Sequence, residues 1–384
     1  MSNSIVLQLD PSRNNGRNSE ATFVTLKGGR ILLAWSRFNT GNHSDSGSCE
    51  IASRYSDDDG WTWSTRDMVM VGRDQGASNV MSPSLLRLKD GRIALLTLRK
   101  EGGEDFCSPW FRTSTNEAKS FSKPVRVNTV PGYYSVNNDR MVQLRNGRII
   151  LPVGMHRWRS PWSLKSEAEL PGDTNTRVPK GTEPVFSSPT LIFFYFSDDG
   201  GRTWLESLTN YYWCTPKGHG LQEPGLIQLK DGRLWSWARP GHIGVEGMRD
   251  VQWESFSRDS GQVWSPPRRS QFISPSSPLQ VKRIPKTGHL LAVWNDTSRR
   301  FKTPKAKPIS WGRTPLVSAI STNEGRTWKH HLLIEDAPDH GFCYPAIHFT
   351  KEAVLLSYNA GGATTRDPLD TQRVRRMTYD TLYA

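Results

Sequence analysis

The chain contains few cysteines, and their spacing gives no sign of a metal centre. Among 384 residues there are four, namely Cys49, Cys107, Cys214 and Cys343. They are dispersed and show none of the close spacings that structural zinc sites use. We therefore expect buried or loop thiols, and neither a metal ion nor another cofactor.

The sequence also lacks long hydrophobic runs. No stretch approaches the roughly 20 consecutive apolar residues that a membrane-spanning helix needs. The chain opens MSNSIVLQLD, without the basic segment followed by an apolar one that marks a secretory signal. We therefore predict no membrane association and a cytoplasmic protein, although a secreted chain that had been trimmed would look the same.

Acidic residues are in the minority. The chain has 37 Asp and Glu against 50 Lys and Arg, which gives a formal net charge of +13. Such an excess can serve nucleic-acid binding, but the sequence shows no recognition helix, no RNA-binding signature and no dense basic helix. A solvated basic surface is one explanation, and attraction of an anionic ligand such as an acidic sugar is the other. We expect a glycan partner and no nucleic acid.

What the chain has in quantity is a short repeat of the form S-x-D/N-x-G-x-T-W. Copies begin at Ser56, Ser197, Ser257 and Ser321, and a degenerate copy begins at Ser114. The pattern suits a tight turn, in which the Asp or Asn side chain bonds backbone amides, Gly takes the strained position and the aromatic residue tucks underneath. Regular recurrence of such a motif indicates a repeat architecture.

A second recurring turn lies between apolar strands. Its copies are 26–31, 88–93, 144–149 and 229–234, with divergent versions at 284–290 and 349–354. Each is followed by a strand that runs toward the first repeat and then by a fourth strand. Four strands in each of six units predict an all-β fold, a six-bladed β-propeller with four-stranded antiparallel blades, in which residues 1–384 form a single domain.

The chain ends and one long connection complete the predicted architecture. Residues 4–10 form a strand without a hairpin of its own, so we expect it to supply the outer strand of the last blade, beside a strand near 373–379. An insertion from about 157 to 187 falls within blade 3 and carries Trp158 and Trp162. It is either a surface excursion or a wall over a central pocket.

In a propeller the inner strands begin near the central axis at one face, so polar residues at their starts can converge on it. Those starts are 18–20, 79–82, 137–140, 222–224, 274–277 and 343–345. Counting along the hairpins pairs Glu223 with Arg239 and places Arg37 opposite Ser19, unless a bulge shifts the register. One such neighbour could be a structural ion pair, but several around one axis predict a ligand site, with Asn138 and Asp139 as further candidates for substrate binding.

These features together resemble the sialidase (neuraminidase) superfamily, whose members are six-bladed propellers with this Asp-box, or BNR, repeat. In that family a glutamate opens an inner strand of the second half and an arginine follows one hairpin later. A further arginine then opens a third strand, and a nucleophilic tyrosine opens the last inner strand. Glu223, Arg239, Arg313 and Tyr344 occupy those places in that order. The resemblance spans essentially the whole chain.

The first half of the chain departs from the family. An Arg-Ile-Pro motif usually opens blade 1, and its arginine is the first of three that clamp the sialic acid carboxylate. Glu20 lies in the corresponding segment here, within Ser-Glu-Ala-Thr. Arg17, Arg37 and Arg140 are the candidates for the missing guanidinium. The family's acid/base residue is an aspartate in the loop after the second strand of blade 1, and Asp45 is the one aspartate of that loop, although it could equally be a turn residue.

The resemblance implies a retaining exo-glycoside hydrolase that needs no metal. Tyr344 would attack the anomeric carbon while Glu223 takes its proton, because a neutral phenol is a poor nucleophile without an adjacent base. Arg239 and Arg313 would hold the substrate carboxylate as two-pronged donors. The leaving group and the attacking water would need an acid/base.

Asp45 or Glu20 would fill that acid/base role. Sialic acid is the leading substrate class, and another acidic sugar follows closely because Glu20 would repel a carboxylate unless it is paired or is itself the acid.

Two alternatives stay open. A polysaccharide lyase acting on uronate-containing glycans would use Tyr344 or a nearby histidine, His43, His156 or His340, as its base. A non-catalytic glycan-binding propeller would keep the polar residues around the axis and lose turnover, an interpretation that the missing clamp arginine favours.

Overall fold

Antiparallel strands make up nearly all the regular structure of this computed structural model, which describes residues 3–39, 41, 44–72, 77–101, 106–156, 190–212, 220–241, 250–365 and 367–384. Besides strands, these residues form a 3-10 turn at Pro308–Ser310 and the short helix α2 (Tyr379–Leu382). In the part of the chain that the structure describes, no helix is both long and apolar enough to cross a bilayer. The fold is all-β, as predicted.

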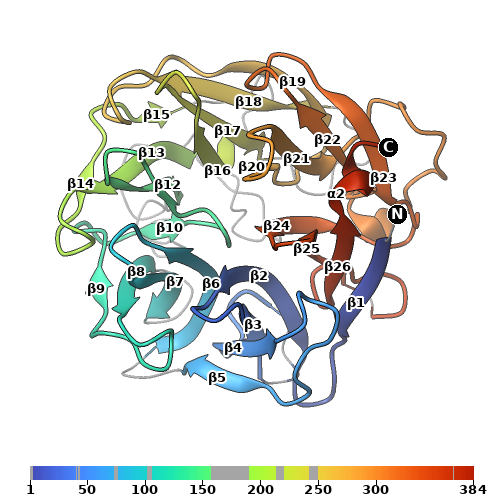
Figure 1. Cartoon of the computed structure of the whole chain (residues 1–384), viewed down its shortest axis with the longest axis horizontal. Helices are drawn as coiled ribbons and strands as arrows, with labels where there is room; N and C mark the ends of the chain where they lie inside the picture. Colours follow the sequence, from blue (N-terminus) through green and yellow to red (C-terminus); the bar gives the residue numbers. More distant parts are fainter. Residues whose placement is uncertain are drawn as a thin grey trace, which may run out of the picture.

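The strands form six blades around a central axis, which confirms the predicted six-bladed β-propeller (Figure 1). Blade 1 contains β2 (Arg17–Thr25), β3 (Ile31–Phe38), β4 (Cys49–Ser56) and β5 (Met68–Val71), and blade 2 contains β6 (Ala77–Arg87), β7 (Ile93–Glu101), β8 (Phe106–Ser114) and β9 (Val125–Arg126). Blade 3 contains β10 (Tyr133–Ser135), β11 (Val142–Gln143), β12 (Ile149–His156), β13 (Thr190–Ser197), β14 (Leu205–Glu206) and β15 (Tyr211–Tyr212). Its inner and outer strands are each split in two.

The second half of the ring is built in the same way. Blade 4 contains β16 (Leu221–Gln228), β17 (Leu234–Pro240), β18 (Asp250–Ser257) and β19 (Arg268–Ser274), and blade 5 contains β20 (Gln280–Arg283), β21 (Leu290–Asn295), β22 (Leu316–Ser321) and β23 (Lys329–Glu335). Blade 6 contains β24 (Cys343–Phe349), β25 (Ala353–Asn359), β26 (Gln372–Thr378) and the first strand of the chain, β1 (Asn3–Leu9). The insertion expected at about 157–187 lies outside the described residues.

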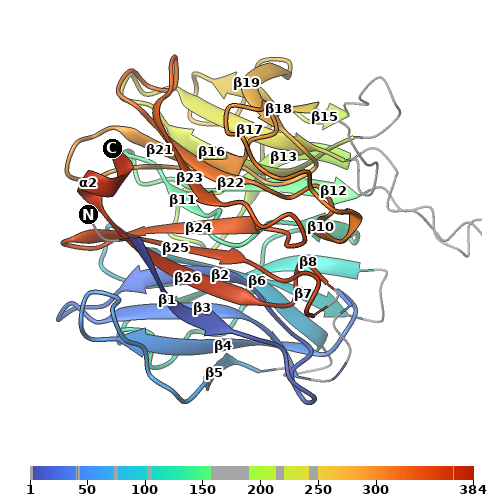
Figure 2. The ribbon, with the colours of Figure 1, turned by 90° about the vertical axis from the view of Figure 1, so that its right-hand side faces the viewer.

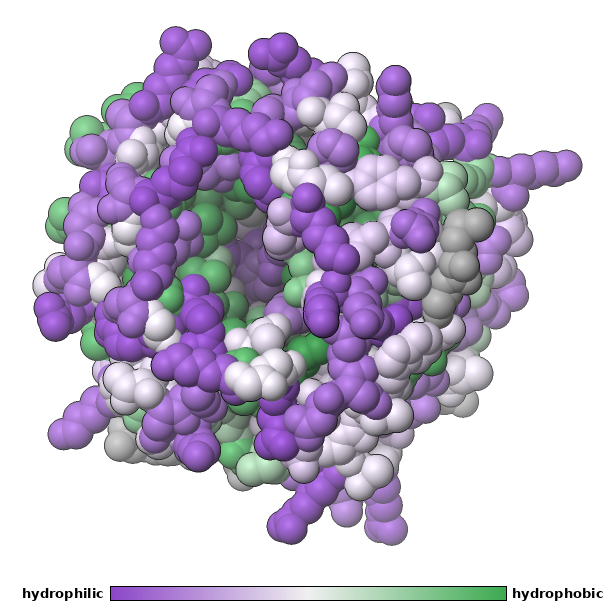
Figure 3. Space-filling view, in the orientation of Figure 1, coloured by the Kyte–Doolittle hydropathy of each residue, from purple (hydrophilic) through white to green (hydrophobic). Residues whose placement is uncertain are grey.

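The two ends of the chain meet in blade 6. β1 pairs with β26 in antiparallel register from Asn3 opposite Met377 to Leu9 opposite Gln372. Figure 2 shows both termini and α2 at the same face of the molecule. Hydrophilic side chains cover most of the face seen in Figure 3, and that face is hollowed at its centre, where the axis of the ring emerges.

The Asp-box turns have the hydrogen bonds that their composition predicts. In the first copy, Ser56 Oγ donates to Asp58 Oδ1 at 2.8 Å and accepts from the Gly60 amide at 3.0 Å, while the Thr62 amide donates to Asp58 Oδ1 at 2.9 Å. The copies at 114, 197, 257 and 321 repeat this pattern. The turn therefore closes on its own side chains, which makes it a local and repeatable unit.

The hydrophobic core is divided among the contacts between neighbouring blades. The Trp235, Trp237 and Phe272 side chains of blade 4 pack with Leu290 and Trp294 of blade 5 in one cluster. Five other clusters join blades 1 and 2, 2 and 3, 3 and 4, 5 and 6, and 6 and 1. Burial between blades thus sets the position of each inner strand at the axis. The thiols of Cys49, Cys107 and Cys343 are buried and free, whereas Cys214 lies outside the described residues.

Candidate active site

Five inner strands carry the same backbone distortion close to the axis. One non-glycine residue in each has a positive φ of between 52° and 59°, namely Glu20, Ser82, Asp139, Glu223 and Tyr344. A left-handed residue with a side chain costs roughly 1–2 kcal/mol, so it persists where the surroundings hold it, often at a functional site. These side chains reach residues of other blades. We call the group formed by Glu20, Ser82, Glu223, Tyr344 and four arginines, Arg17, Arg140, Arg239 and Arg313, the cup.

The distortion moves the strand register by one residue relative to the hairpin count. Arg239 pairs with Gln222 and not with Glu223, and Arg37 pairs with Asn18, one residue before the predicted partner. In each hairpin the register shift falls at the positive-φ residue. The predicted pairings are therefore wrong by one residue, because a bulge adds a position that counting from the turn does not see.

Tyr344 and Glu223 meet at the centre of the cup. The Tyr344 hydroxyl donates a hydrogen bond of 2.9 Å to Glu223 Oε1, although the two residues are 121 positions apart in sequence. Glu223 Oε2 also accepts a short hydrogen bond from Arg239 Nε, and the two side chains form an ion pair. Both Tyr344 and Glu223 are buried, with 9 % of each exposed. The arrangement brings a phenol and a carboxylate into the geometry that proton transfer between them requires.

The charges around the pair separate the protonation states of its two members. Burial raises the pKa of Glu223, but the positive charge of Arg239 and the hydrogen bonds to the carboxylate outweigh burial and lower the pKa to about 2. Burial, followed by the negative charge of Glu223, raises the pKa of Tyr344 well above its ordinary value. At neutral pH the site therefore holds an ionised acceptor next to a protonated phenol.

Two buried arginines of the cup lack a carboxylate partner among the described residues. The guanidinium of Arg313 lies 5.2 Å from the Trp311 ring and 5.5 Å from the Tyr344 ring, and its Nη1 donates to Cys343 Sγ at 3.3 Å. Arg140 donates from Nη1 to Gln280 Oε1 at 2.8 Å, its Nε has no described hydrogen-bond partner, and burial lowers its pKa to about 10. A buried guanidinium without a bonded carboxylate has donors left for a ligand, so both arginines favour an anionic one.

The blade 1 side of the cup contains three charged groups. Arg17 is 2 % exposed, and its Nε donates to Ser19 Oγ at 2.8 Å. Its Nη1 forms an ion pair with Asp45 Oδ1 at 2.5 Å, and its Nη2 lies 3.5 Å from Glu20 Oε1. The structure thus brings Arg17 next to the position of the missing arginine, but Asp45 already pairs with it and Glu20 lies beside it.

Three other residues predicted to bind substrate are bonded to groups of the chain itself. Arg37 pairs with Glu50 and, at 3.1 Å, with Asp67, both on the outer side of blade 1. Asn138 donates to two backbone carbonyls, and Asp139 accepts from groups of blades 1, 5 and 6. These contacts engage the Arg37 guanidinium, the Asn138 amide nitrogen and the Asp139 carboxylate within the chain.

The sequence prediction omitted two serines that contact the cup's charged groups. Ser82 Oγ donates a short hydrogen bond to Glu20 Oε2, and Ser276 Oγ accepts from Arg239 Nη1 at 2.6 Å. A signal for Ser82 was present, since it stands directly before a proline at an inner strand, as Glu223 and Tyr344 do. Ser276 lies in the predicted inner-strand start 274–277, but it does not precede a proline.

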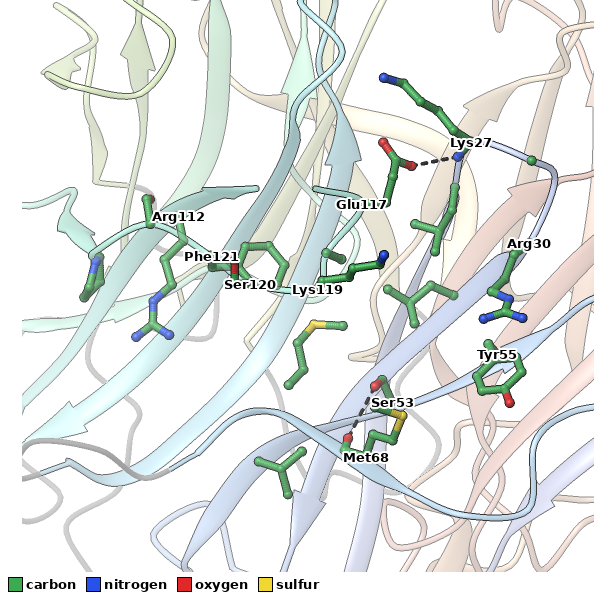
Figure 4. A pocket seen from close by; sticks show the side chains of 18 of the residues that line it. Lys27, Arg30, Ser53, Tyr55, Met68, Arg112, Glu117, Lys119, Ser120 and Phe121 are labelled. Carbon is green, nitrogen blue, oxygen red and sulfur yellow. Dashed lines mark hydrogen bonds between the residues drawn. The ribbon is translucent and has the colours of Figure 1, made fainter. Parts of the chain in front are cut away.

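A separate cavity of about 890 Å³ lies between blades 1 and 2, beside the turns at the other end of the strands. Figure 4 shows Lys27, Arg30, Tyr55 and Lys119 around it, with the Lys27 amide bonded to Glu117 Oε2 at 2.7 Å. None of the described residues that line it belongs to the cup.

Comparison with known proteins supports the fold. Residues 29–356 match the family described as BNR repeat-like domain. No curated protein matches the chain in sequence. Among solved structures, a protein of unknown function from Dyadobacter fermentans is 18 % identical with a TM-score of 0.69, and the match covers 98 % of this chain and 99 % of that one.

Two sialidases are similar at lower identity. Trypanosoma rangeli sialidase, solved with 2,3-difluorosialic acid as a covalent intermediate, is 13 % identical with a TM-score of 0.66, and the match covers 96 % of this chain and 55 % of that one. The NanB sialidase of Streptococcus pneumoniae is 14 % identical with a TM-score of 0.67, with coverage of 98 % and 71 %. At these identities the likeness is one of fold, and this chain spans little more than half of the trypanosomal protein.

Proposed function

Because the chain belongs to the BNR repeat-like family of the sialidase superfamily, we propose that it is a retaining exo-glycoside hydrolase that removes a terminal acidic sugar. Sialic acid is the first substrate class to test. The observation that carries the proposal is the 2.9 Å hydrogen bond from the Tyr344 hydroxyl to Glu223, buried beside Arg239 and Arg313.

The first chemical step follows from the protonation states of this pair. The Tyr344 oxygen bonds to the anomeric carbon as its proton passes to Glu223, which is ionised at neutral pH. A neutral nucleophile suits an anomeric centre that already bears a carboxylate, because an anionic side chain would be repelled by it. The bond to the leaving oxygen breaks at the same centre, which yields a covalent glycosyl-tyrosine.

An acidic sugar is the substrate that the charges of the cup support. Arg313 and Arg140 are each at most 4 % exposed, and neither forms an ion pair with a carboxylate among the described residues. A substrate carboxylate would satisfy the planar donors of Arg313 and compensate both charges. A neutral sugar would leave both guanidiniums without a bonded carboxylate.

The proposal is tested by measuring turnover and covalent labelling together. The wild-type protein is incubated with a panel of 4-methylumbelliferyl sialosides, uronides and neutral glycosides, and separately with 2,3-difluorosialic acid. We expect release of 4-methylumbelliferone from the sialoside and an intact-mass increase of one glycosyl group, located on Tyr344 by peptide mapping. Tyr344→Phe should abolish both, because it removes the attacking oxygen.

Tyr195→Phe is the matched control. Tyr195 is also buried and also donates to a glutamate, Glu206 Oε1 at 2.7 Å, but it lies in β13 within blade 3. It should keep full activity. Cleavage of uronides alone would show that the substrate is a uronic acid and not sialic acid. Ultraviolet-absorbing products would identify a lyase, and no turnover of any substrate in the panel would indicate a glycan-binding protein. Full activity of Tyr344→Phe on its substrate would rule out the nucleophile.

A further inference from the structure

We propose that Glu20, and not Asp45, is the acid–base residue of this hydrolase, which protonates the departing glycosidic oxygen and later accepts a proton from the attacking water. The inference rests on the proposed function and concerns the same cup. It assigns the role to a residue of the inner strand of blade 1, whereas the resemblance places the acid in the loop that follows the second strand.

Glu20 lies in the same backbone setting as the nucleophile pair, and it is within electrostatic range of Glu223. Its φ of 56° matches the 53° of both Glu223 and Tyr344. A single nitrogen, Asn138 Nδ2, donates both to the carbonyl of Ala21 at 2.7 Å and to the carbonyl of Tyr344 at 3.3 Å. The residue after Glu20 and the nucleophile are therefore held together at the axis, with both strained side chains in the cup.

The surroundings of Glu20 allow it to hold a proton at neutral pH. Its side chain is 7 % exposed, and its contact with Arg17 Nη2 is long, at 3.5 Å. Oε2 accepts from Ser82 Oγ, and the Glu20 amide donates to Asn359 Oδ1 at 3.2 Å. Burial raises the pKa of Glu20 to about 7 and outweighs the charge of Arg17, which lowers it.

Charged and titratable groups from four other parts of the chain also face Glu20. Asp45 and Glu223 are the acidic ones, and both raise its pKa by repulsion. The thiols of Cys49 and Cys107 lie within electrostatic range, but burial raises the pKa of each, so both are neutral at pH 7. Arg17 is therefore the cation that opposes these effects.

Asp45 is placed as an ionised anchor for Arg17. Its side chain is 57 % exposed and forms the 2.5 Å ion pair with Arg17 Nη1. Partial desolvation raises the pKa of Asp45, but the charges of Arg17 and Lys100 outweigh it and lower the net value. Its carbonyl oxygen accepts from Lys100 Nζ at 2.6 Å and from Asn79 Nδ2 at 3.1 Å. A carboxylate held in this way is a poor proton donor, and it draws Arg17 away from Glu20.

The proton balance of the two steps is complete with these residues. In the first step the Tyr344–carbon bond forms and the carbon–leaving oxygen bond breaks, Glu223 gains the tyrosine proton and Glu20 gives its own to the leaving oxygen. In the second step water attacks the same carbon, its proton goes to Glu20, and Tyr344 leaves as it recovers its proton from Glu223. Both carboxyl groups return to their starting states, and configuration is retained.

Leaving-group dependence tests the assignment. Glu20→Gln and Asp45→Asn are compared with wild type on 4-methylumbelliferyl sialoside, whose leaving group needs little protonation, and on sialyllactose, whose leaving group needs much. We expect Glu20→Gln to lose about 10²–10⁴-fold in kcat/KM on sialyllactose and far less on the aryl sialoside. Azide should accelerate its aryl turnover and yield the glycosyl azide. At a pH well below the pKa of Glu20, Asp45→Asn should keep the wild-type ratio between the two substrates.

The pH profile gives a second readout that a structural role would not move. In wild type, kcat/KM should fall as pH rises through about 7, the pKa of Glu20, because the acid loses its proton. Glu20→Gln should lack this limb. Asp45→Asn should move it to lower pH by removing a repelling charge, and Ser82→Ala should move it to higher pH by removing a donor to the carboxylate.

Three outcomes would overturn the assignment. If Glu20→Gln loses kcat/KM equally on both substrates, Glu20 has a positioning or structural role. If only Asp45→Asn shows leaving-group dependence, Asp45 in the loop is the acid. If Glu20→Gln does not fold, an unmoved limb in Ser82→Ala decides against Glu20. An inactive and unlabelled wild type would overturn the proposed function as well, so the two failures are distinguishable.

Discussion

Two glutamates in equivalent backbone positions have opposite protonation states because their neighbours differ. Arg239 is bonded directly to Glu223 and lowers its pKa to about 2, whereas Glu20 receives only a long contact from a shared arginine and has a pKa of about 7. Environments that separate the pKa values of two carboxyl groups in this way let one group act as a base and the other as an acid at the same pH. The chemistry of the cup is thus decided residue by residue.

Arg313 offers a residue-scale prediction about anion binding. Arg313→Lys should weaken binding of free sialic acid by about 10–100-fold, because the variant keeps the charge but loses the planar pair of donors and the contact with the Trp311 and Tyr344 rings, a loss of about 1.5–3 kcal/mol. Isothermal titration calorimetry of the folded variant measures this. Arg283→Lys, in which the native arginine bonds Glu324 at 2.7 Å away from the cup, should bind as wild type does. Unchanged affinity of Arg313→Lys for sialic acid would show that Arg313 does not bind the ligand carboxylate.

At the scale of the element, the Asp-box turn joins neighbouring blades through its glycine. Gly201 has a φ of +94°, and its amide donates to Ser197 Oγ at 2.8 Å. A β-carbon added there would lie 2.0 Å from Cε1 of Phe111, a core residue of blade 2. The turn belongs to blade 3, so its geometry also determines how closely two blades pack. The hairpin turn at Gly91 has a similar φ of +88° but nothing within 4 Å of that position.

This difference predicts unequal costs for the same substitution. Gly201→Ala should lower the free energy of unfolding by about 3 kcal/mol or more, because backbone strain of about 1–2 kcal/mol adds to overpacking of a core aromatic. Gly91→Ala should cost only the backbone strain. Urea unfolding midpoints of the two variants and wild type measure both costs. Equal midpoints for the two variants would contradict a role of the turn in blade packing.

At the scale of the whole molecule, Asp139 connects blades across the axis. Its Oδ1 accepts from Lys282 Nζ at 2.7 Å and from Thr22 Oγ1 at 3.3 Å, and its Oδ2 accepts from the Ile347 amide at 3.1 Å and from Gln280 Nε2 at 3.2 Å. These partners come from blades 1, 5 and 6, while Asp139 belongs to blade 3. A carboxylate that is 7 % exposed and this fully bonded is a structural centre of the ring.

Removing its charge should therefore loosen several blades together. Asp139→Asn should lower the free energy of unfolding by about 3 kcal/mol, since it breaks an ion pair with Lys282 and disturbs the remaining bonds. Hydrogen exchange should show reduced protection in β2, β20 and β24 at once. Asp231→Asn, at an exposed hairpin turn where Asp231 pairs with Arg233, should cost less than about 1 kcal/mol. Loss of protection confined to blade 3 would argue against a connecting role.

Much of this protein was predictable from the sequence because its blades are built from local, recurring chemistry. The Asp-box turn closes on its own side chains, so Ser56 and its repeats mark the blades wherever they occur. Apolar strands between two kinds of turn then leave one architecture that buries them all. Within it, the order of Glu223, Arg239, Arg313 and Tyr344 along the chain indicated the cup, and the structure brings all four together.

What only the tertiary structure decided depends on groups that are distant in sequence. A strained residue shifts the register of the inner strands β2, β6, β16 and β24 by one position, and the turn composition from which the count starts contains no trace of it. Asp139 is a structural centre and Arg37 an outer ion pair because of partners that other strands supply. Whether Glu20 holds a proton depends on burial and on how Arg17 is shared, and both are set by the packing of blades. Local patterns determine the elements, whereas charge, desolvation and pairing across the axis exist only once the ring is formed.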